Sequence, residues 1–577
     1  MDLKELIAKI IADNLNISDI SQEQIIEFLN APPEPALGDY ALPCFKLAKV
    51  LKNSPVKIAD DLAQKINQNS LPLELDKVSA VNGYLNFYIN RSLFMKDVAD
   101  NYKNGTPKQD IGKGRVVCID YSSINIAKHF HMGHLSTTAI GGSLYRIFNY
   151  LGYKSVGINH LGDYGTQFGK LICAYKMWSS EEKLAKDGLN ELHELYVRYH
   201  QEAESNPALD DIAREWSKKI EQKDPEAVQI YERFKQITLE NIGKIYERLG
   251  VTFDSYLGES FFADRVGEVV KLLEEKKLLE ESDGAKVVKL DEFDMPPCLI
   301  LRSDGASLYA TRDLATAIYR KQTYDFYKCL YVVAYQQNLH FRQFFKVLEL
   351  MGYEWAKDLI HVSYGMVSLE DGAMSTRGGK LVKLVDVLDK AVEKTKNIIK
   401  EKNPDADNTD EVAEAVGVGA VIFSSLCNSK IKDIVFSWDR VLNFDGETGP
   451  YLQYTHARCC SVLKKAGVDI NNLVMPSSLQ SVDADFGANL DDNTWTLIKN
   501  INTFFDQIVL AAQNYEPSII ANRIIDIAQG YNKFYFDYKI LDENPAVQKA
   551  RLLITMAVKN CLKTGMELLL LKPLEQM

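Results

Sequence analysis

Apolar residues from position 116 onward form short runs that alternate with longer segments of helical period. The first run, 116–119, indicates a buried strand, and the segment after it, 139–150, has apolar residues at every third or fourth position, as an amphipathic helix does. Later runs predict further strands, at 155–161, 286–290, 298–303, 328–335 and 361–369. Strands that alternate with helices are typical of a parallel sheet, so we expect an α/β domain here.

The segments on either side of this pattern differ from it. Residues 1–110 combine helical stretches with an alternating, strand-like run at 78–90, which predicts a small α/β module. Residues 179–250 are charged, helix-rich and poor in apolar clusters, which favours a helical insertion. Helical patterns dominate after about 380. We therefore expect three domains: 1–110, 111–440 with the insertion at about 179–250, and an all-α domain at 441–577.

Composition excludes several classes of protein. The 577 residues are 46% hydrophobic and 25% charged, which is ordinary for a folded globular protein. The nine cysteines include no Cys-x-x-Cys pair, which argues against a disulfide framework or a cysteine zinc site and fits the reducing cytoplasm. No apolar run approaches the length of a membrane span. The net charge of −12 means that any nucleic-acid partner needs a local basic face.

The most informative stretch is 120–170, which begins with three histidines in six residues, namely His129, His131 and His134. A metal site is one interpretation, but no nearby Cys, Asp or Glu completes the ligand set. A structural turn is the second. In the third, the imidazoles donate hydrogen bonds to a triphosphate, and Gly133 leaves room for the nucleotide. The strand before the turn and the helix after it favour the third interpretation.

A second motif, Met374-Ser375-Thr376-Arg377-Gly378-Gly379-Lys380, predicts a loop of small residues with two cations. A surface turn is the simplest interpretation. Alternatively, a flexible cationic loop can close over a polyphosphate and stabilise a pyrophosphate leaving group.

Together the two motifs resemble the HIGH and KMSKS signatures of class I aminoacyl-tRNA synthetases, and the chain is most similar to the arginyl-tRNA synthetase family. Six segments carry this resemblance in the family's order: SSINIAKHFHMGHL (122–135), LGDYGTQFG (161–169), YATRD (309–313), QQNLH (336–340), MSTR (374–377) and GPYLQYTHAR (449–458). They span about 340 residues.

The resemblance implies a fold and an activity. The expected fold is a Rossmann-type parallel-sheet catalytic domain, with a small α/β N-terminal domain that contacts the tRNA D-loop and an all-α anticodon-binding domain. The expected enzyme condenses L-arginine with ATP to arginyl-adenylate and transfers the arginyl group to the 3′ end of tRNA(Arg). Mg²⁺ would arrive with ATP, without a dedicated protein metal site, and a cytoplasmic monomer is expected. The alternatives are a nucleotidyltransferase acting on a small molecule and an inactive RNA-binding paralogue.

The resemblance also assigns roles to residues of this chain. The implied catalytic residues are Lys128, His131, His134, Arg377 and Lys380. The implied arginine-binding residues are Asp120, Ser123, Ile124, Asn125, His134, Tyr309, Asp313 and Gln337, with the two carboxylates on the guanidinium. The implied ATP-binding residues are His131, Gly133, His134, Met374 and Ser375. The implied tRNA-binding residues are Tyr84, Asn86, Tyr454, Arg458, Tyr531 and Tyr535, although a core position is the alternative for each aromatic residue.

This chain departs from the family pattern at several positions. Asp120 stands where the family usually has Glu, and Ile124 and His129 replace prolines. The loop at 374–380 lacks the second lysine of the KMSKS motif. In the family, a lysine three residues before the first histidine is thought to compensate, and Lys128 occupies that position; Lys380 is the other candidate.

Overall fold

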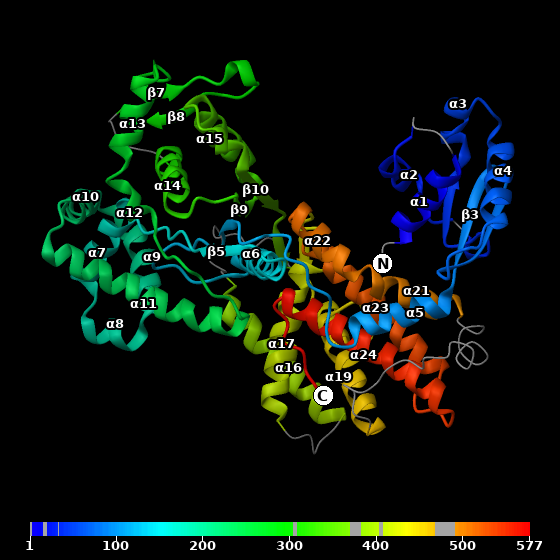
Figure 1. Cartoon of the computed structure of the whole chain (residues 1–577). Coiled ribbons are helices and arrows are strands. Elements are labelled where there is room, and N and C mark those ends of the chain that lie inside the picture. The colour runs from blue at the N-terminus through cyan, green and yellow to red at the C-terminus, as the bar shows by residue number, and fades with distance from the viewer. Residues whose placement is uncertain are drawn as a thin grey trace. The chain divides into compact units, whose positions relative to one another are not determined.

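The computed structural model describes residues 3–15, 20–32, 34–303, 309–369, 382–402, 408–467 and 491–577. The chain divides into two compact units, and Figure 1 labels helices and strands of both. Unit 1 consists of Met1–Pro107, Cys459–Thr503 and Asp526–Cys561, and unit 2 consists of Lys108–Arg458, Phe504–Ile525 and Leu562–Met577.

Unit 1 begins with an α/β module built on a three-stranded antiparallel sheet of order β1-β3-β2. Its strands are β1 (Tyr40–Pro43), β2 (Leu75–Val81) and β3 (Tyr84–Ile89). Its helices are α1 (Leu3–Leu15), α2 (Gln22–Phe28), α3 (Ala48–Leu51), α4 (Pro55–Gln68) and α5 (Arg91–Tyr102). Helix α4 begins at Pro55, because Ser54 caps it and Pro55 suits its first turn.

The centre of unit 2 is a parallel sheet of order β10-β9-β4-β5. The strands are β4 (Val116–Asp120), β5 (Lys154–Ile158), β9 (Lys328–Ala334) and β10 (Leu359–Tyr364). From β4 the chain passes through α6 (Met132–Tyr150) to β5 on one side, and it later returns to β9 on the other side. The order of strands therefore reverses at β4. In open α/β sheets such a reversal leaves a crevice at the carboxyl ends of the strands, where ligands bind.

Not every predicted strand joins this sheet. The runs at 286–290 and 298–303 form β7 (Ala285–Val288) and β8 (Cys298–Leu301), which pair with β6 (Glu280–Ser282) in a separate antiparallel sheet. The run at 361–369 divides into β10 and β11 (Val367–Leu369), and β11 pairs with β12 (Ile434–Phe436).

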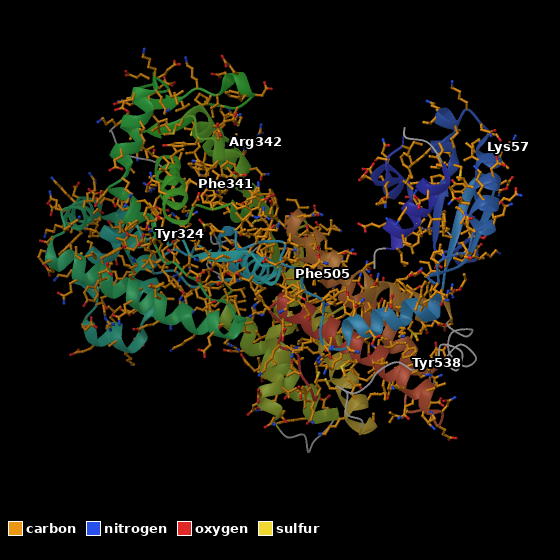
Figure 2. The ribbon with its side chains drawn as sticks, viewed as in Figure 1. Lys57, Tyr324, Phe341, Arg342, Phe505 and Tyr538 are labelled. Carbon is orange, nitrogen blue, oxygen red and sulfur yellow. The ribbon has the colours of Figure 1, made fainter. Side chains whose placement is uncertain are left out.

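Helices cover both faces of the parallel sheet. Helix α6 packs against β4, β5 and β9, and it also contacts α17 (Thr409–Leu426) and α22 (Phe504–Asn514). The other face buries apolar side chains of α13 (Val266–Glu275), α14 (Tyr309–Tyr324) and α15 (Asn338–Leu350). Phe341 of α15, labelled in Figure 2, stacks on His361 of β10 with 4.2 Å between ring centroids.

The predicted insertion at 179–250 is helical. After α7 (Thr166–Trp178) it consists of α8 (Glu181–Asp187), α9 (Leu189–Ser205), α10 (Ala208–Glu221) and α11 (Pro225–Leu249). A short helix, α12 (Glu259–Ala263), then leads to α13.

The C-terminal part of the chain is helical, as the sequence predicts. The remaining helices are α16 (Leu384–Lys402), α18 (Trp438–Val441), α19 (Gly449–Ala466), α21 (Asp492–Asn502), α23 (Ser518–Asp537) and α24 (Pro545–Leu568). The division between the two compact units falls within α19, α23 and α24, so these units do not coincide with the predicted domain 441–577. No helix in the described ranges is long and apolar enough to cross a bilayer.

Candidate active site

The histidine-rich turn lies at the carboxyl end of β4 and leads directly into α6. The helix begins at Met132, seven residues earlier than the apolar pattern alone indicates. It begins there because His131 is its N-cap: the Nδ1 atom of His131 accepts a hydrogen bond from the N–H of Gly133, at 3.0 Å. His134 completes a capping box, since its Nδ1 atom accepts from the N–H of His131, at 3.2 Å.

These bonds fix the tautomer of both imidazoles. A neutral imidazole whose Nδ1 atom accepts a hydrogen bond carries its proton on Nε2. Burial, reinforced by the charge of Lys128, lowers the pKa of His131. Burial, with smaller contributions from His131 and Lys128, lowers the pKa of His134 to about 3. Both rings are therefore neutral at pH 7, and their centroids lie 3.8 Å apart. Each ring keeps an Nε2–H group as a donor beside the start of α6.

Gly133 is required by the geometry of this turn. A Cβ atom at position 133 would lie 2.8 Å from Cε1 and 2.9 Å from Nδ1 of His131. A side chain there would displace the imidazole that caps the helix.

The segment between β4 and the histidines has a strained backbone. Ser122, Ser123 and Ala127 have φ angles of 70°, 40° and 62°, a region that residues other than glycine rarely adopt. Hydrogen bonds to Gly162 hold the segment, because the Gly162 N–H donates to Ile124 and its carbonyl accepts from Ile126. Strain of this kind persists where the surrounding structure enforces it, and it is common at functional sites.

The predicted arginine-binding residues of this segment have different environments. Asp120 is buried at the end of β4, whereas Asn125 is exposed and Ser123 is half-buried. The Ser123 hydroxyl donates to Asp120, at 2.7 Å. Ile124 is buried, and its carbonyl accepts a hydrogen bond from the Gly162 N–H.

Helix α14 carries the second part of the predicted arginine site. Tyr309, the first residue of α14, is largely exposed, and Asp313 lies one turn further on. The carboxylate of Asp313 lies 2.7 Å from Nε2 of His340, the last residue of the QQNLH segment. Gln337 is exposed in the short 3₁₀ turn after β9. Asp120 is the last residue of β4 and Gln337 follows the neighbouring parallel strand β9, so both lie at the carboxyl ends of the strands.

Lys128 belongs to the described part of the chain, whereas the cationic loop at 374–380 does not. Lys128 is exposed, with Nζ 6.0 Å from the ring centroid of Tyr196 in α9. Met374, Ser375, Arg377 and Lys380 lie outside the described residues. The described residues begin again at 382. The N–H of Leu384 donates a hydrogen bond to the carbonyl of Phe130 at 2.9 Å, which places residues 383–384 beside the histidine turn.

Three residues near the predicted site were not assigned by the sequence. Arg320 bonds to Asp120, and His340 bonds to Asp313. Glu259 pairs with Arg312 at 3.2 Å; burial, opposed by Arg312 and reinforced by Asp313 and Asp163, raises the pKa of Glu259 to about 7. The signal for Arg320 was its position seven residues after Asp313, a spacing that puts both residues on one face of a helix.

The candidate tRNA-binding residues of unit 1 divide into exposed and buried groups. Tyr84 and Tyr535 are each about two-fifths exposed. Asn86 is buried in the central strand β3, so its contact with a base stays a prediction. The prediction for Tyr531 is wrong, because its ring is fully buried and its hydroxyl lies 3.4 Å from that of Thr555. The neighbouring Phe536, which the sequence analysis missed, is 88% exposed.

The GPYLQYTHAR segment forms the first turns of α19. Tyr454 is exposed, and the guanidinium of Arg458 lies 4.9 Å from the centroid of its ring. Gln453 and His456 are buried and bond to the backbone of the last residues of the chain, Lys572 and Leu574.

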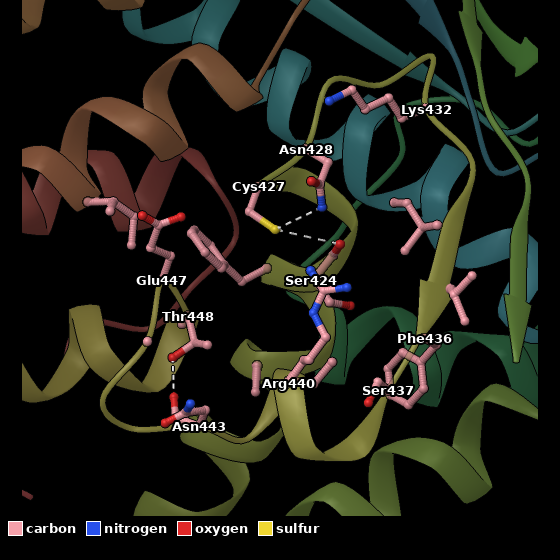
Figure 3. A pocket seen from close by; sticks show the side chains of 18 of the residues that line it. Ser424, Cys427, Asn428, Lys432, Phe436, Ser437, Arg440, Asn443, Glu447 and Thr448 are labelled. Carbon is pink, nitrogen blue, oxygen red and sulfur yellow. Dashed lines mark hydrogen bonds between the residues drawn. The ribbon is translucent and has the colours of Figure 1, made fainter. Parts of the chain in front are cut away.

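A separate pocket of about 470 Å³ lies between α17, β12, α18 and the start of α19 (Figure 3). Cys427 and Arg440 line it together with Asn428 and Phe436. None of the predicted site residues lines this pocket.

Comparisons with known proteins match every part of the chain to one family. The family model "tRNA synthetases class I (R), catalytic domain" matches residues 98–438. The "DALR anticodon binding domain" matches 452–577, and the "Arginyl tRNA synthetase N terminal domain" matches 1–89. The arginine–tRNA ligase of Clostridioides difficile is 50% identical over 557 residues, which are 96% of each chain. That of Halothermothrix orenii is 48% identical over the full length of both.

Solved structures show the same fold. The Thermus thermophilus arginyl-tRNA synthetase matches with a TM-score of 0.79 at 24% identity, covering all of both chains. The Plasmodium falciparum enzyme matches with a TM-score of 0.79 at 22% identity, covering 100% of this chain and 99% of that one.

The family models and the relatives extend over both flanking segments, which excludes a nucleotidyltransferase that lacks RNA-binding domains. The chain belongs to the class I arginyl-tRNA synthetases and is an ATP-dependent arginine–tRNA ligase.

Proposed function

We propose that the turn before α6 is where ATP and arginine meet. The supporting observation is that both Nδ1 atoms, of His131 and His134, are bonded to backbone N–H groups, which leaves both Nε2–H groups as donors. Two neutral donors beside a helix N-terminus suit a triphosphate, because they stabilise developing negative charge without fixing a counter-charge in the ground state. Gly133 gives the nucleotide access to this turn.

In the proposed first step, the arginine carboxylate attacks the α-phosphorus of ATP, and pyrophosphate leaves. In the second step, a ribose hydroxyl at the 3′ end of tRNA(Arg) attacks the adenylate carbonyl, and AMP leaves. No side chain forms a covalent intermediate, so positioning and charge stabilisation carry the reaction. Lys128, Arg377 and Lys380 are the cations assigned to the charge on the phosphates, with Met374 and Ser375 beside the nucleotide.

The arginine side chain is proposed to bind between β4 and α14. A guanidinium has five donors in one plane, which carboxylates and a hydroxyl satisfy well. Asp313 is partly exposed and can accept from the substrate while it remains bonded to His340. Asp120 and Tyr309 complete the guanidinium site, and Ser123, Asn125, His134 and Gln337 are assigned to the remainder of the amino acid.

Mg²⁺ is proposed to enter with ATP and to be held by the phosphate oxygens. In the described part of the chain, no group of three or more His, Cys, Asp or Glu residues is arranged to hold a metal ion. The cation would neutralise charge on the phosphates, a contribution separate from that of the imidazoles.

The proposed tRNA contacts are exposed aromatic rings and a guanidinium. Tyr84 is assigned to a D-loop base, and Tyr535 and Phe536 to anticodon bases, because splayed RNA bases are read by stacking on such rings. Tyr454 and Arg458 form the remaining candidate contact. A cytoplasmic monomer with domains near 1–110, 111–440 and 441–577 is the proposed state, and light scattering coupled to size exclusion tests whether the mass equals 65.2 kDa.

Two substitutions at one position test the role of His131. His131→Asn retains an acceptor at the Nδ1 position and can still cap α6, but it removes the Nε2–H donor. His131→Gln places an amide N–H near the Nε2 position. We expect His131→Asn to slow arginyl-adenylate formation roughly 100-fold and His131→Gln to recover part of this loss. Equal adenylate formation by His131→Asn and the wild type would refute the donor role.

A further inference from the structure

A buried ion pair lies directly behind the proposed arginine site. Nη2 of Arg320 donates to Oδ2 of Asp120 at 2.7 Å, and the Ser123 hydroxyl donates to Oδ1 at the same distance. The side chains of Arg320 and Asp120 are 2% and 8% exposed. Both carboxylate oxygens of Asp120 therefore have a fixed partner within the protein.

Arg320 is held by few other groups. Its Nη1 atom is buried with no hydrogen-bond partner in the described part of the chain. Its guanidinium carbon lies 5.3 Å from the ring centroid of Tyr331, which stands opposite Asp120 on the neighbouring strand β9. Removing a guanidinium from water is costly unless an anion compensates it, so Asp120 is the group that retains this charge inside the protein.

The position of Arg320 on α14 connects it to the substrate. Arg320 follows Asp313 by seven residues, which is almost two full turns, so both side chains leave the same face of the helix. Asp313 lies near the start of the helix, beside the substrate site, and Arg320 lies deeper, under the end of β4. Helix α14 thus carries both the carboxylate of Asp313 and the guanidinium that pairs with the carboxylate of Asp120.

We propose that Arg320 is a positioning residue of the arginine site: it cancels the charge of Asp120 and fixes the direction of its carboxylate, so that Asp313 supplies the charge that balances the substrate guanidinium. Asp120 then acts as an oriented hydrogen-bond acceptor of a neutral pair. Of these two carboxylates, Asp313 is then the one whose charge is available to the incoming cation. This inference rests on the proposed role of Asp120 in arginine binding.

A double-mutant cycle tests the inference. The variants are Arg320→Gln, Asp120→Asn and the double variant, each assayed by aminoacylation for the KM of arginine and the KM of ATP. We expect Arg320→Gln to raise the KM of arginine roughly tenfold or more and to leave the KM of ATP within about twofold, because only the arginine site loses an oriented group. In the Asp120→Asn background, the same substitution should add little.

Controls separate positioning from a general structural role. Arg248→Gln breaks the pairing of another arginine, with the carboxylates of Asp389 and Glu414. None of these three residues is assigned to the arginine site, so this variant should leave the KM of arginine unchanged. Arg320→Lys keeps the charge and should recover most of the affinity that Arg320→Gln loses. If Arg320→Gln does not fold, Asp120→Asn is compared with the double variant instead. The inference predicts equal KM values of arginine for these two variants, and unequal values would overturn it.

The outcomes distinguish the inference from the proposed function. An unchanged KM of arginine in Asp120→Asn would overturn the role of Asp120, and the inference with it. A raised KM in Asp120→Asn, combined with additive effects of Arg320→Gln or with an equal rise in the KM of ATP, would overturn the inference alone.

Discussion

At the scale of single residues, the site is governed by which charges are compensated. Asp120 has Arg320 and Ser123 as partners, whereas Asp313 has His340 and remains partly open to solvent. His131 and His134 are kept neutral by burial and by the charge of Lys128. Of the two carboxylates, Asp313 therefore remains accessible to the cationic substrate, and the exposed Lys128 is accessible to the anionic one.

Asp313→Asn is expected to weaken arginine binding. The substitution removes a charged acceptor of the guanidinium and costs about 1.5–3 kcal/mol, which raises the KM of arginine roughly 10- to 150-fold. The measurement is aminoacylation over a range of arginine concentrations. Asp325→Asn is the control, since Asp325 forms a surface ion pair with Lys321 just beyond the same helix. Unchanged KM and kcat in Asp313→Asn would contradict the assignment.

Lys128→Ala is expected to slow adenylate formation more than it weakens arginine binding. The ammonium group stabilises charge that develops on the phosphates, so its loss appears mainly in kcat, by roughly 10- to 100-fold. Lys170→Ala is a matched control: Lys170 also lies over a tyrosine ring of α9, with Nζ 5.5 Å from the centroid of Tyr199, but it has no assigned role in the site. If Lys128→Ala only lowers the melting temperature, Lys128 is structural.

At the scale of elements, the start of α6 combines a helix cap with a group of buried imidazoles. His129, which stands where the family usually has proline, is buried against His193, with 5.0 Å between ring centroids. Burial, with smaller contributions from Lys383 and His193, lowers the pKa of His129 to about 4. Burial in this turn therefore lowers the pKa of His129, as it does those of His131 and His134.

The lowered pKa of His129 predicts that the folded protein loses stability in acid. Between pH 6.5, the ordinary pKa of histidine, and about pH 4, the unfolded chain binds the proton that His129 excludes when folded, so stability falls as pH falls through this window. His129→Phe retains an aromatic ring and should remove up to about 1.4 kcal/mol per pH unit of this dependence. The measurement is the melting temperature from pH 7 to pH 4. Parallel curves for the variant and the wild type would contradict the pKa assignment.

At the scale of the whole molecule, the tRNA-binding segments and the active site belong to one chain, and the family resemblance suggests that they depend on each other. We expect pyrophosphate exchange with arginine to require tRNA. The measurement is exchange with and without bulk tRNA, with periodate-oxidised tRNA as the control that binds but cannot accept arginine. Robust exchange without tRNA would refute this dependence.

Periodic patterns and short motifs predicted much of the architecture. The strands of the parallel sheet, the helical segment at 179–250 and the all-α C-terminal part follow from local apolar spacing, which backbone geometry converts into secondary structure. The pattern missed about the first two turns of α6, because a histidine cap and the glycine after it carry no apolar period. It also could not assign β7 and β8 to a separate sheet, since pairing partners are not encoded by alternation.

The sequence by itself determined the order of the elements, the six segments shared with the arginyl-tRNA synthetases and most of the candidate site residues. Only the tertiary structure decided which of these side chains are open and which are compensated. Tyr531 and Asn86 are buried and Phe536 is exposed, and Asp120 is paired with a residue 200 positions away. Burial and ion pairing depend on neighbours that folding brings together from distant parts of the chain, and no local pattern records them.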